Sequence, residues 1–171
     1  MKNNNLTLVT LLSAISILVA VNSLHSVYAQ ENMTNSEEPK FFAIQHAQSG
    51  SISEINETAY FLELNDVSDK TILFSDRPDR IVTSISTSDF LGNWSTGEDS
   101  FVIDPPNAVL VVDEQEGQQQ DVAIVELFTP VYDSDKKALK YEVTPDNATS
   151  IDLPDEFGQT TLVIDISDQY G

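Results

Sequence analysis

Two arginines, Arg77 and Arg80, are the only arginines in the chain of 171 residues, and they lie three positions apart. Asp76 and Asp79 stand directly beside them, in the sequence Phe-Ser-Asp-Arg-Pro-Asp-Arg. A guanidinium stays charged and presents a planar fork of N–H donors that fits a carboxylate, sulfate or phosphate. The pattern favours a clamp for an anionic ligand, or an internal network in which neighbouring carboxylates occupy the same donors.

The segments that follow supply further candidates for the same cluster. Trp94 is the only tryptophan of the chain, and the sequence Asp-Pro-Pro-Asn places a carboxylate at Asp104 and an amide at Asn107. We interpret the group first as an internal electrostatic tie and second as a ligand site. Its predicted members are Asp76, Arg77, Asp79, Arg80, Trp94, Asp104 and Asn107.

The side chains on which most enzymes depend are scarce. His46 is the only histidine after residue 29, and there is no cysteine. A catalytic triad would have a single candidate base, and a zinc or copper site built from several imidazoles or thiolates is excluded. The sequence contains neither a glycine-rich phosphate loop nor a nucleophile elbow. We predict no catalytic residue and no metal site, and we expect His46 to face solvent or bond a neighbour on a strand.

Carboxylates are so frequent, at 28, that their pairing alone indicates little. A pair could supply the acid and the base of an extracellular hydrolase, which stays the alternative function. Three segments with two aspartates each, 66–69, 133–135 and 165–168, could also hold calcium, although none matches the EF-hand loop. Solvated turns are the simpler interpretation, so we expect no cofactor and keep calcium as the weaker alternative.

The N-terminus has the pattern of a secretory signal, with Lys2 followed by a mainly apolar run from Leu6 to Val21 and, at Val27 and Ala29, residues of the small or modest size that a signal peptidase requires. We predict a signal peptide over 1–29, a flexible leader over 30–40 and a single domain over 41–171. An uncleaved membrane anchor is the alternative. We expect a secreted or cell-surface protein that has no membrane association once the signal is removed.

The charge balance bears on the partners. Residues 30–171 carry seven basic and 28 acidic side chains, a net charge of −21. Phosphate backbones would be repelled, so no nucleic acid is expected. Charge of this size keeps an exported protein soluble, and we expect a monomer whose partner is an unknown extracellular ligand or envelope component. Asn56 and Asn147 fit the glycosylation acceptor pattern in predicted turns.

The domain shows short apolar runs with period-2 alternation, separated by Asn, Asp, Ser, Gly and Pro clusters, which is typical of antiparallel strands. The expected strands are 41–47, 51–56, 59–65, 71–74, 81–85, 108–112, 122–128, 139–143 and 160–167. A short helix is expected over 86–94, with Ser86 or Ser88 as its N-cap. The continuous apolar run at 108–112 predicts a central strand covered on both faces. Pro130 predicts an edge or a bulge after the strand at 122–128. We predict an all-β sandwich of about eight or nine strands with one short helix; a partly open barrel is the alternative.

Several of these segments together also resemble a known family. The stretch from Phe74 to Arg80, then Trp94, then Asp-Ser-Phe at 99–101 and Asp-Pro-Pro-Asn-Ala at 104–108 are similar to the signature of uncharacterised small exported bacterial and archaeal proteins. The match covers roughly residues 46–143. It implies an exported single domain and carries no activity, ligand or catalytic residue. The leading hypothesis is an exported, non-catalytic binding or envelope-associated module.

Overall fold

The computed structural model of the protein describes residues 39–113, 120–146 and 151–166. The predicted signal peptide over 1–29, nearly all of the leader and Asn147 lie outside these ranges, so those assignments stay predictions. No helix in the described ranges is both long enough and apolar enough to span a membrane.

The prediction of an antiparallel all-β domain with one short helix is confirmed. The structure has ten strands where the sequence indicated eight or nine, and the added one is a two-residue strand in the segment expected to be a loop. The strands are β1 (Phe41–Ala47), β2 (Ser49–Asn56), β3 (Ala59–Asn65), β4 (Lys70–Ser75), β5 (Val82–Ser86), β6 (Asn107–Asp113), β7 (Gln120–Asp133), β8 (Ala138–Pro145), β9 (Glu156–Phe157) and β10 (Thr160–Asp165). The helix is α2 (Thr87–Gly92).

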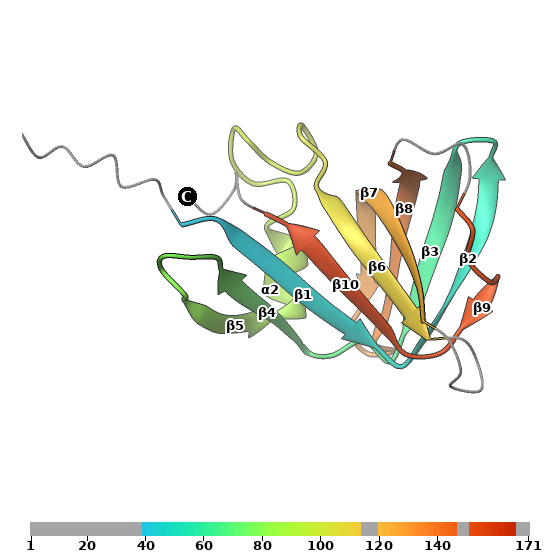
Figure 1. Cartoon of the computed structure of the whole chain (residues 1–171), viewed down its shortest axis with the longest axis horizontal. Helices are drawn as coiled ribbons and strands as arrows, with labels where there is room; N and C mark the ends of the chain where they lie inside the picture. Colours follow the sequence, from blue (N-terminus) through green and yellow to red (C-terminus); the bar gives the residue numbers. More distant parts are fainter. Residues whose placement is uncertain (1–38, 114–119, 147–150, 167–171) are drawn as a thin grey trace, which may run out of the picture. The chain divides into compact units, whose positions relative to one another are not determined.

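All ten strands belong to one hydrogen-bonded sheet, in the order β5-β4-β1-β10-β6-β7-β8-β3-β2-β9 (Figure 1). Every neighbouring pair is antiparallel. Strands β5 and β9 are the two edges, so the sheet is not closed into a barrel.

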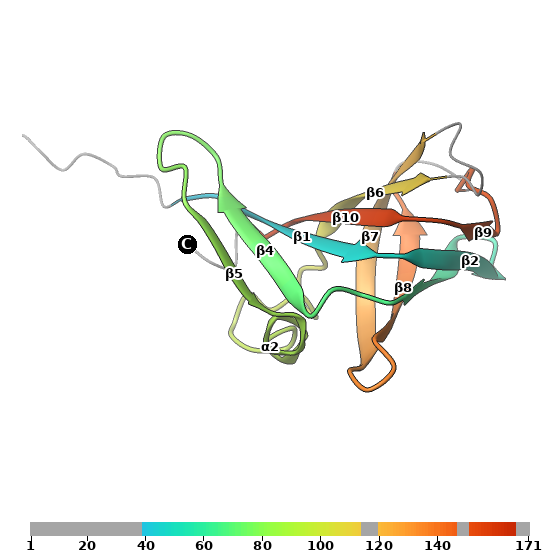
Figure 2. The same cartoon turned by 90° about the horizontal axis from the view of Figure 1, so that it is seen from below.

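The sheet curls so that strands distant in this order face each other. Three strands separate β1 from β8, yet the hydroxyl of Tyr141 on β8 donates a hydrogen bond of 2.9 Å to the Gln45 side chain on β1. Figure 2 shows β7, β8 and helix α2 on the same side of strands β1, β10 and β6. One face of the sheet therefore encloses the core, and the other face looks outward.

Alternation along each strand decides which residues enter this core. On β8, Leu139, Tyr141 and Val143 are buried, while the lysine and glutamate between them are less buried. Burying an apolar side chain of this size stabilises a fold by about 1.5 to 3 kcal/mol. The period-2 pattern thus fixes the register, because a shift by one residue would exchange the two faces.

Strand β6 is central, as its run of five apolar residues predicts, but it is not covered on both faces. It pairs with β10 and β7. Ala108, Leu110 and Val112 are fully buried, whereas Val109 and Val111 on the opposite face are only half-buried. A continuous apolar run is typical of strands with two covered faces, and here the second cover is missing from the described domain.

Strand β7 passes through Pro130 without ending. The register shifts between Phe128 and Val131, and Thr129 has a φ of 41°. Both structures expected at this proline, an edge and a bulge, are present in the described residues: the bulge lies between Phe128 and Val131, and beyond Glu126 the strand has no register with β6 and pairs with β8 alone. The bend lets one strand pair along two differently oriented parts of the sheet.

Helix α2 follows directly on β5 and carries an aromatic cluster into the core. The Ser86 side chain accepts a hydrogen bond of 2.9 Å from the Asp89 backbone, as expected for an N-cap. Phe90 and Trp94, four residues apart, are both buried, and Trp94 lies 4.7 Å from Phe101 between ring centroids. The cluster also contacts strand β8 across the core, because the ring centroids of Trp94 and Tyr141 are 5.6 Å apart.

The short strand β9 depends on a close approach to Gly50. A Cβ at Gly50 would meet the Phe157 ring and would lie 2.8 Å from the Glu63 carbonyl oxygen. Phe157 is 1% exposed and pairs with Gly50 in the sheet. Only glycine leaves room for this ring against the backbone.

Candidate functional site

The two arginines lie in the connection between β4 and β5, which we call the hairpin tip (76–81). The Ser75 and Ile81 backbones close it with a hydrogen bond of 2.9 Å, and the Ser75 hydroxyl accepts a second one of 2.8 Å from Ile81. The peptide bond before Pro78 is cis, and Arg80 has a φ of 51°. The tip is therefore a defined turn whose side chains are exposed.

Neither guanidinium forms an ion pair with a carboxylate of the described residues. Over the ranges that the structure covers, no acidic oxygen lies within 4.0 Å of Arg77 or Arg80. Asp76 instead accepts a hydrogen bond of 2.6 Å from the backbone N–H of Arg77. The expectation of a buried electrostatic tie is thus not supported, and the role of these side chains as a ligand site stays a prediction.

The other predicted members of the cluster do not join the tip. Trp94 is buried in the aromatic cluster, 4% exposed. Asp104 is exposed in the loop before β6, and Asn107 begins β6, where it pairs with Glu126 of β7. The structure therefore places one predicted member in the core, and two at the start of the central strand β6, four positions from β5 in the sheet order.

Two lysines, one in the turn between β7 and β8 and one on β8, form ion pairs with acidic side chains, in contrast to the arginines. Lys136 contacts Asp133 at 2.8 Å, and Lys140 contacts Glu63 at 2.9 Å. The hydrogen bond from Lys136 holds the pKa of the Asp133 carboxyl below its usual value. A general acid needs a raised pKa, so Asp133 is unsuited to that role.

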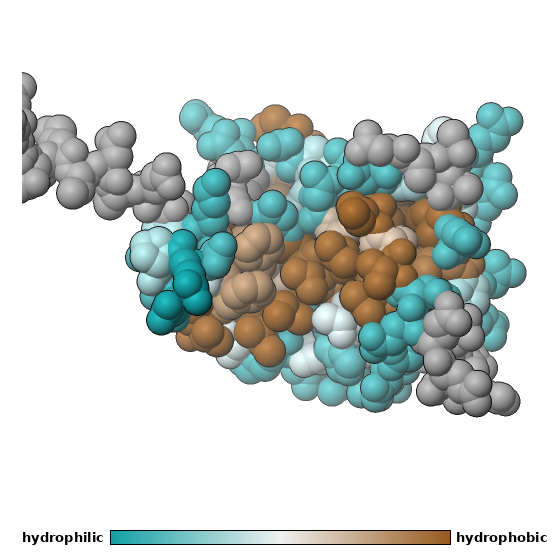
Figure 3. Space-filling model, in the orientation of Figure 1, coloured by the Kyte–Doolittle hydropathy of each residue, from teal (hydrophilic) through white to brown (hydrophobic). Residues whose placement is uncertain are grey.

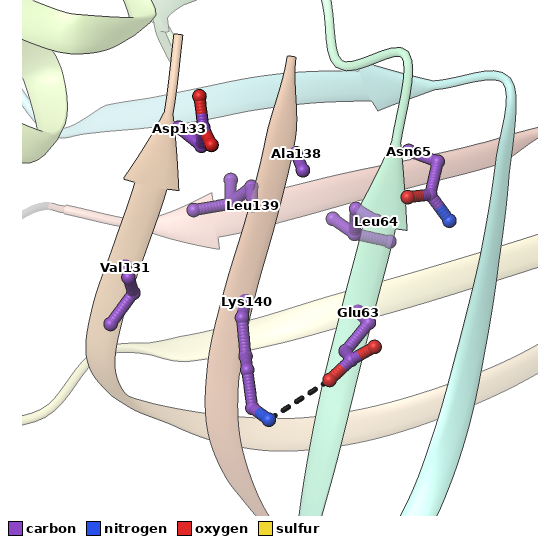
Figure 4. Close-up of a pocket in the computed structure, with 8 residues that line it drawn as sticks. All are labelled: Glu63, Leu64, Asn65, Val131, Asp133, Ala138, Leu139 and Lys140. Atoms are coloured by element: carbon purple, nitrogen blue, oxygen red, sulfur yellow. Dashed lines mark hydrogen bonds and ion pairs between the residues drawn. The ribbon is translucent and has the colours of Figure 1, made fainter. Parts of the chain in front are cut away.

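A shallow hollow of about 240 Å3 lies beside these pairs, between β7, β8 and β3. Figure 4 shows Glu63 and Lys140 joined across it, with Asp133 at its other end. Ligand sites usually exceed about 300 Å3 and are enclosed. The hollow contains two carboxylates, but each is already in contact with a lysine.

A buried polar chain crosses the interior, and sequence reasoning missed it. Tyr141 donates to Gln45, whose amide nitrogen lies 3.5 Å from the Thr71 hydroxyl. The Thr71 and Thr87 hydroxyls are 3.1 Å apart, and Thr87 donates to the Ser68 carbonyl at 2.7 Å. Burial raises the pKa of the Tyr141 hydroxyl well above its usual range. This series of hydrogen bonds connects β8, β1, β4 and α2 through neutral side chains.

The outward side of the sheet is an apolar surface that no sequence motif singled out. Strand pairing aligns five aliphatic side chains in one row across β4, β1, β10, β6 and β7. We call the row and the apolar residues beside it the outer face. The row is Ile72, Ile44, Val163, Val109 and Ile124, and beside it lie Val82, Phe74, Phe42, Val111 and Val122.

Several apolar side chains of the outer face are far more exposed than apolar side chains usually are in a folded domain. Ile124 is 51% exposed and Val122 is 60% exposed, while Phe42 and Phe74 stack with centroids 5.3 Å apart and are half-buried. Figure 3 shows a continuous hydrophobic area over β1, β10 and β6, bordered by hydrophilic residues at the β4–β5 hairpin. Patches of this kind on a soluble domain usually mark a contact surface.

Two further predicted residues can be placed. His46 lies on β1 at the border of the outer face, with Nδ1 3.3 Å from the Thr161 hydroxyl, which confirms a strand histidine bonded to a neighbour. Asn56 is exposed at the end of β2, where its side-chain oxygen accepts hydrogen bonds from the Thr58 and Ala59 backbones across the turn to β3. Its glycosylation stays a prediction.

Metal binding has no support in the described ranges, where no group of three or more histidines, cysteines or acidic residues could hold an ion. Asp69 of the first aspartate pair contacts Lys137 at 3.1 Å. Asp168 of the third pair lies outside the described residues.

A sequence signal for the outer face was available. On β1 the large side chains Phe42 and Ile44 point outward, while the inward positions hold Ala43, Gln45 and Ala47. Apolar residues at both alternating positions distinguish such a strand from a half-buried one. This pattern marks single strands, and the shared surface follows only when the strand order is known as well.

Comparisons of the chain with protein-family models, curated proteins and solved structures find no match. The resemblance to small exported proteins therefore stays a prediction.

Proposed function

We propose that this protein is an exported, non-catalytic binding module that engages its partner through the outer face. The observation that carries the proposal is the aligned aliphatic row from Ile72 on β4 to Ile124 on β7, whose two ends are exposed and whose middle members are half-buried in the described domain. Covering exposed apolar area yields roughly 25 cal/mol per Å2. Export rests on the sequence pattern of residues 1–29.

A carboxylate-dependent hydrolase is not favoured by any contact described above. The two carboxylates beside the hollow, Glu63 and Asp133, pair with lysines, and the pKa of Asp133 is lowered. Panels of glycosidase and esterase substrates should therefore show no turnover. Turnover that disappears on replacing one acidic residue, with an unchanged melting temperature, would restore the hydrolase.

The binding proposal is tested by a panel that contains glycans, small anions, anionic vesicles and the protein itself. Val122→Lys and Val131→Lys form a matched pair, because both residues lie on β7 and are 60% and 66% exposed. Val122 belongs to the outer face, whereas Val131 lies beyond the bulge beside Lys140. We expect Val122→Lys to remove binding and Val131→Lys to retain it. Equal binding by both variants would contradict the proposal.

A further inference from the structure

We propose that the partner of the outer face is a second copy of this chain, packed face to face about a twofold axis parallel to β1 and β10. The proposal rests on the proposed function, since it names the partner of the same surface. It replaces the monomer that net charge alone predicts.

The row of aliphatic side chains suits such a contact. A twofold interface needs a surface that is complementary to itself. Ile44 pairs with both Ile72 and Val163 in register, and Val109 continues the row beside Val163. A row of similar β-branched side chains presents alternating ridges and grooves, so the ridges of one copy can pack into the grooves of the other.

The dimensions indicate what else must take part. Six strands at about 4.8 Å spacing make the face about 24 Å wide, and the span from Phe42 to His46 is about 14 Å long. The footprint is on the order of 300 Å2, while a specific interface covers about 800 Å2 per partner. The apolar row alone is too small, so the charged margins must contribute, and we expect a concentration-dependent dimer.

At one end of the outer face, basic and acidic side chains lie on opposite sides, which suits a twofold contact. At the end of the face where Phe42 lies, the β4 and β1 side carries Arg77, Arg80 and Lys40, all exposed. The opposite side of the same end carries Asp104 before β6 and the half-buried Glu126 on β7, which accepts a hydrogen bond of 3.3 Å from the Thr144 hydroxyl, while Asp165 on β10 adds an exposed carboxylate between the two sides. A twofold axis along the strands places the basic side of one copy over the acidic side of the other.

The tip also contains Asp76 and Asp79, so its own net charge is zero. Asp76 is engaged with the Arg77 backbone at 2.6 Å. A guanidinium on its long stem reaches further than an aspartate carboxylate, so it is the group that meets an approaching surface. An anionic membrane is less suited as the partner, because the acidic side of the face would be repelled.

Sedimentation of the purified protein over a concentration series tests the proposal. We expect a monomer–dimer equilibrium, and we expect Val122→Lys to raise its dissociation constant at least about tenfold, since a buried charge without a partner is costly. Val131→Lys is the control and should leave the constant unchanged. Thermal melts of both variants check that each is folded.

Charge reversal tests the orientation. Arg77→Glu with Arg80→Glu should weaken the dimer, and adding Asp104→Lys with Glu126→Lys in the same chain should restore it. Lys136→Glu with Lys137→Glu, in the turn between β7 and β8, is the control, because it changes the net charge by the same amount as the two arginine replacements. Failure of the second pair to restore association would overturn the twofold arrangement.

The outcomes separate this proposal from the binding module. A protein that stays monomeric at every concentration would contradict the proposed dimer. If that monomer binds a vesicle or a glycan and Val122→Lys removes the binding, the module stands. If no analyte in the panel is bound, both proposals fail.

Discussion

The buried polar chain through Gln45 and the exposed hairpin tip differ in charge and in what they join. The tip carries formal charges and leaves both guanidinia without an ion pair within the described ranges. The interior chain carries none, yet it connects β1, β4, β8 and α2 through contacts of 2.9 to 3.5 Å. Rare charged residues attract attention in a sequence, but neutral groups make the internal tie in this fold.

The physical reason lies in desolvation. Removing a charge from water costs several kcal/mol unless its partner is well placed. A neutral hydroxyl or amide costs far less, and each buried one here has a partner, because no buried side-chain nitrogen or oxygen in the described ranges lacks a hydrogen bond. Four changes would sharpen or break this contrast between interior and tip.

The largest effect is expected in the aromatic cluster that packs against the interior chain. Trp94→Ala should lower the free energy of unfolding by about 3 to 5 kcal/mol, because it removes a buried ring in contact with Phe101 and Tyr141. Denaturant melts provide the measurement. A loss under about 1 kcal/mol would show that the cluster is not part of the core.

The next effect is on the chain itself. Tyr141→Phe deletes the hydroxyl that donates to Gln45 and should cost about 1 to 3 kcal/mol, because the buried amide oxygen loses its partner. Tyr60→Phe is the control at a less buried tyrosine. Unchanged stability of Tyr141→Phe would show that the chain contributes nothing net.

The same hydroxyl predicts a pH dependence. Its pKa is raised in the folded state above the usual value of 10.0. The unfolded chain releases this proton near pH 10 while the folded chain keeps it, so stability is full below that pH and falls above it. Melts at increasing alkaline pH should show a steeper loss for the wild type than for Tyr141→Phe. Equal slopes would contradict the assignment.

The smallest effects are expected at the tip. Arg77→Ala should change the free energy of unfolding by no more than about 0.5 kcal/mol, because the side chain is exposed and unpaired in the described structure. Arg80→Gly should be neutral or slightly stabilising, since glycine adopts a φ of 51° without cost. Destabilisation by about 3 kcal/mol in either variant would revive the internal tie.

The sequence predicted the local elements well, because each depends on a short pattern. The alternation of Leu139, Tyr141 and Val143, the cap at Ser86 and the break at Pro130 all correspond to observed features. Pairing order and the curl of the sheet depend on contacts between distant residues, such as Gln45 with Tyr141, and no local pattern contains them.

The site was less predictable for the same reason. Arg77 was correctly placed in a turn between two strands, but its relation to Trp94 and Asp104 was inferred from sequence proximity, which the fold does not preserve. Conversely, Ile72 and Ile124 are far apart in the chain and become members of one row only through four successive strand pairings.

The bulge in β7 has a consequence for how the domain comes apart. The same strand pairs with β6 before the bend and continues with β8 after it, so hydrogen bonding runs without a break from one edge of the sheet to the other. No group of strands can separate from the rest and keep a core of its own, because all ten belong to one sheet around one core. Heat or denaturant should therefore unfold the whole domain in a single cooperative transition.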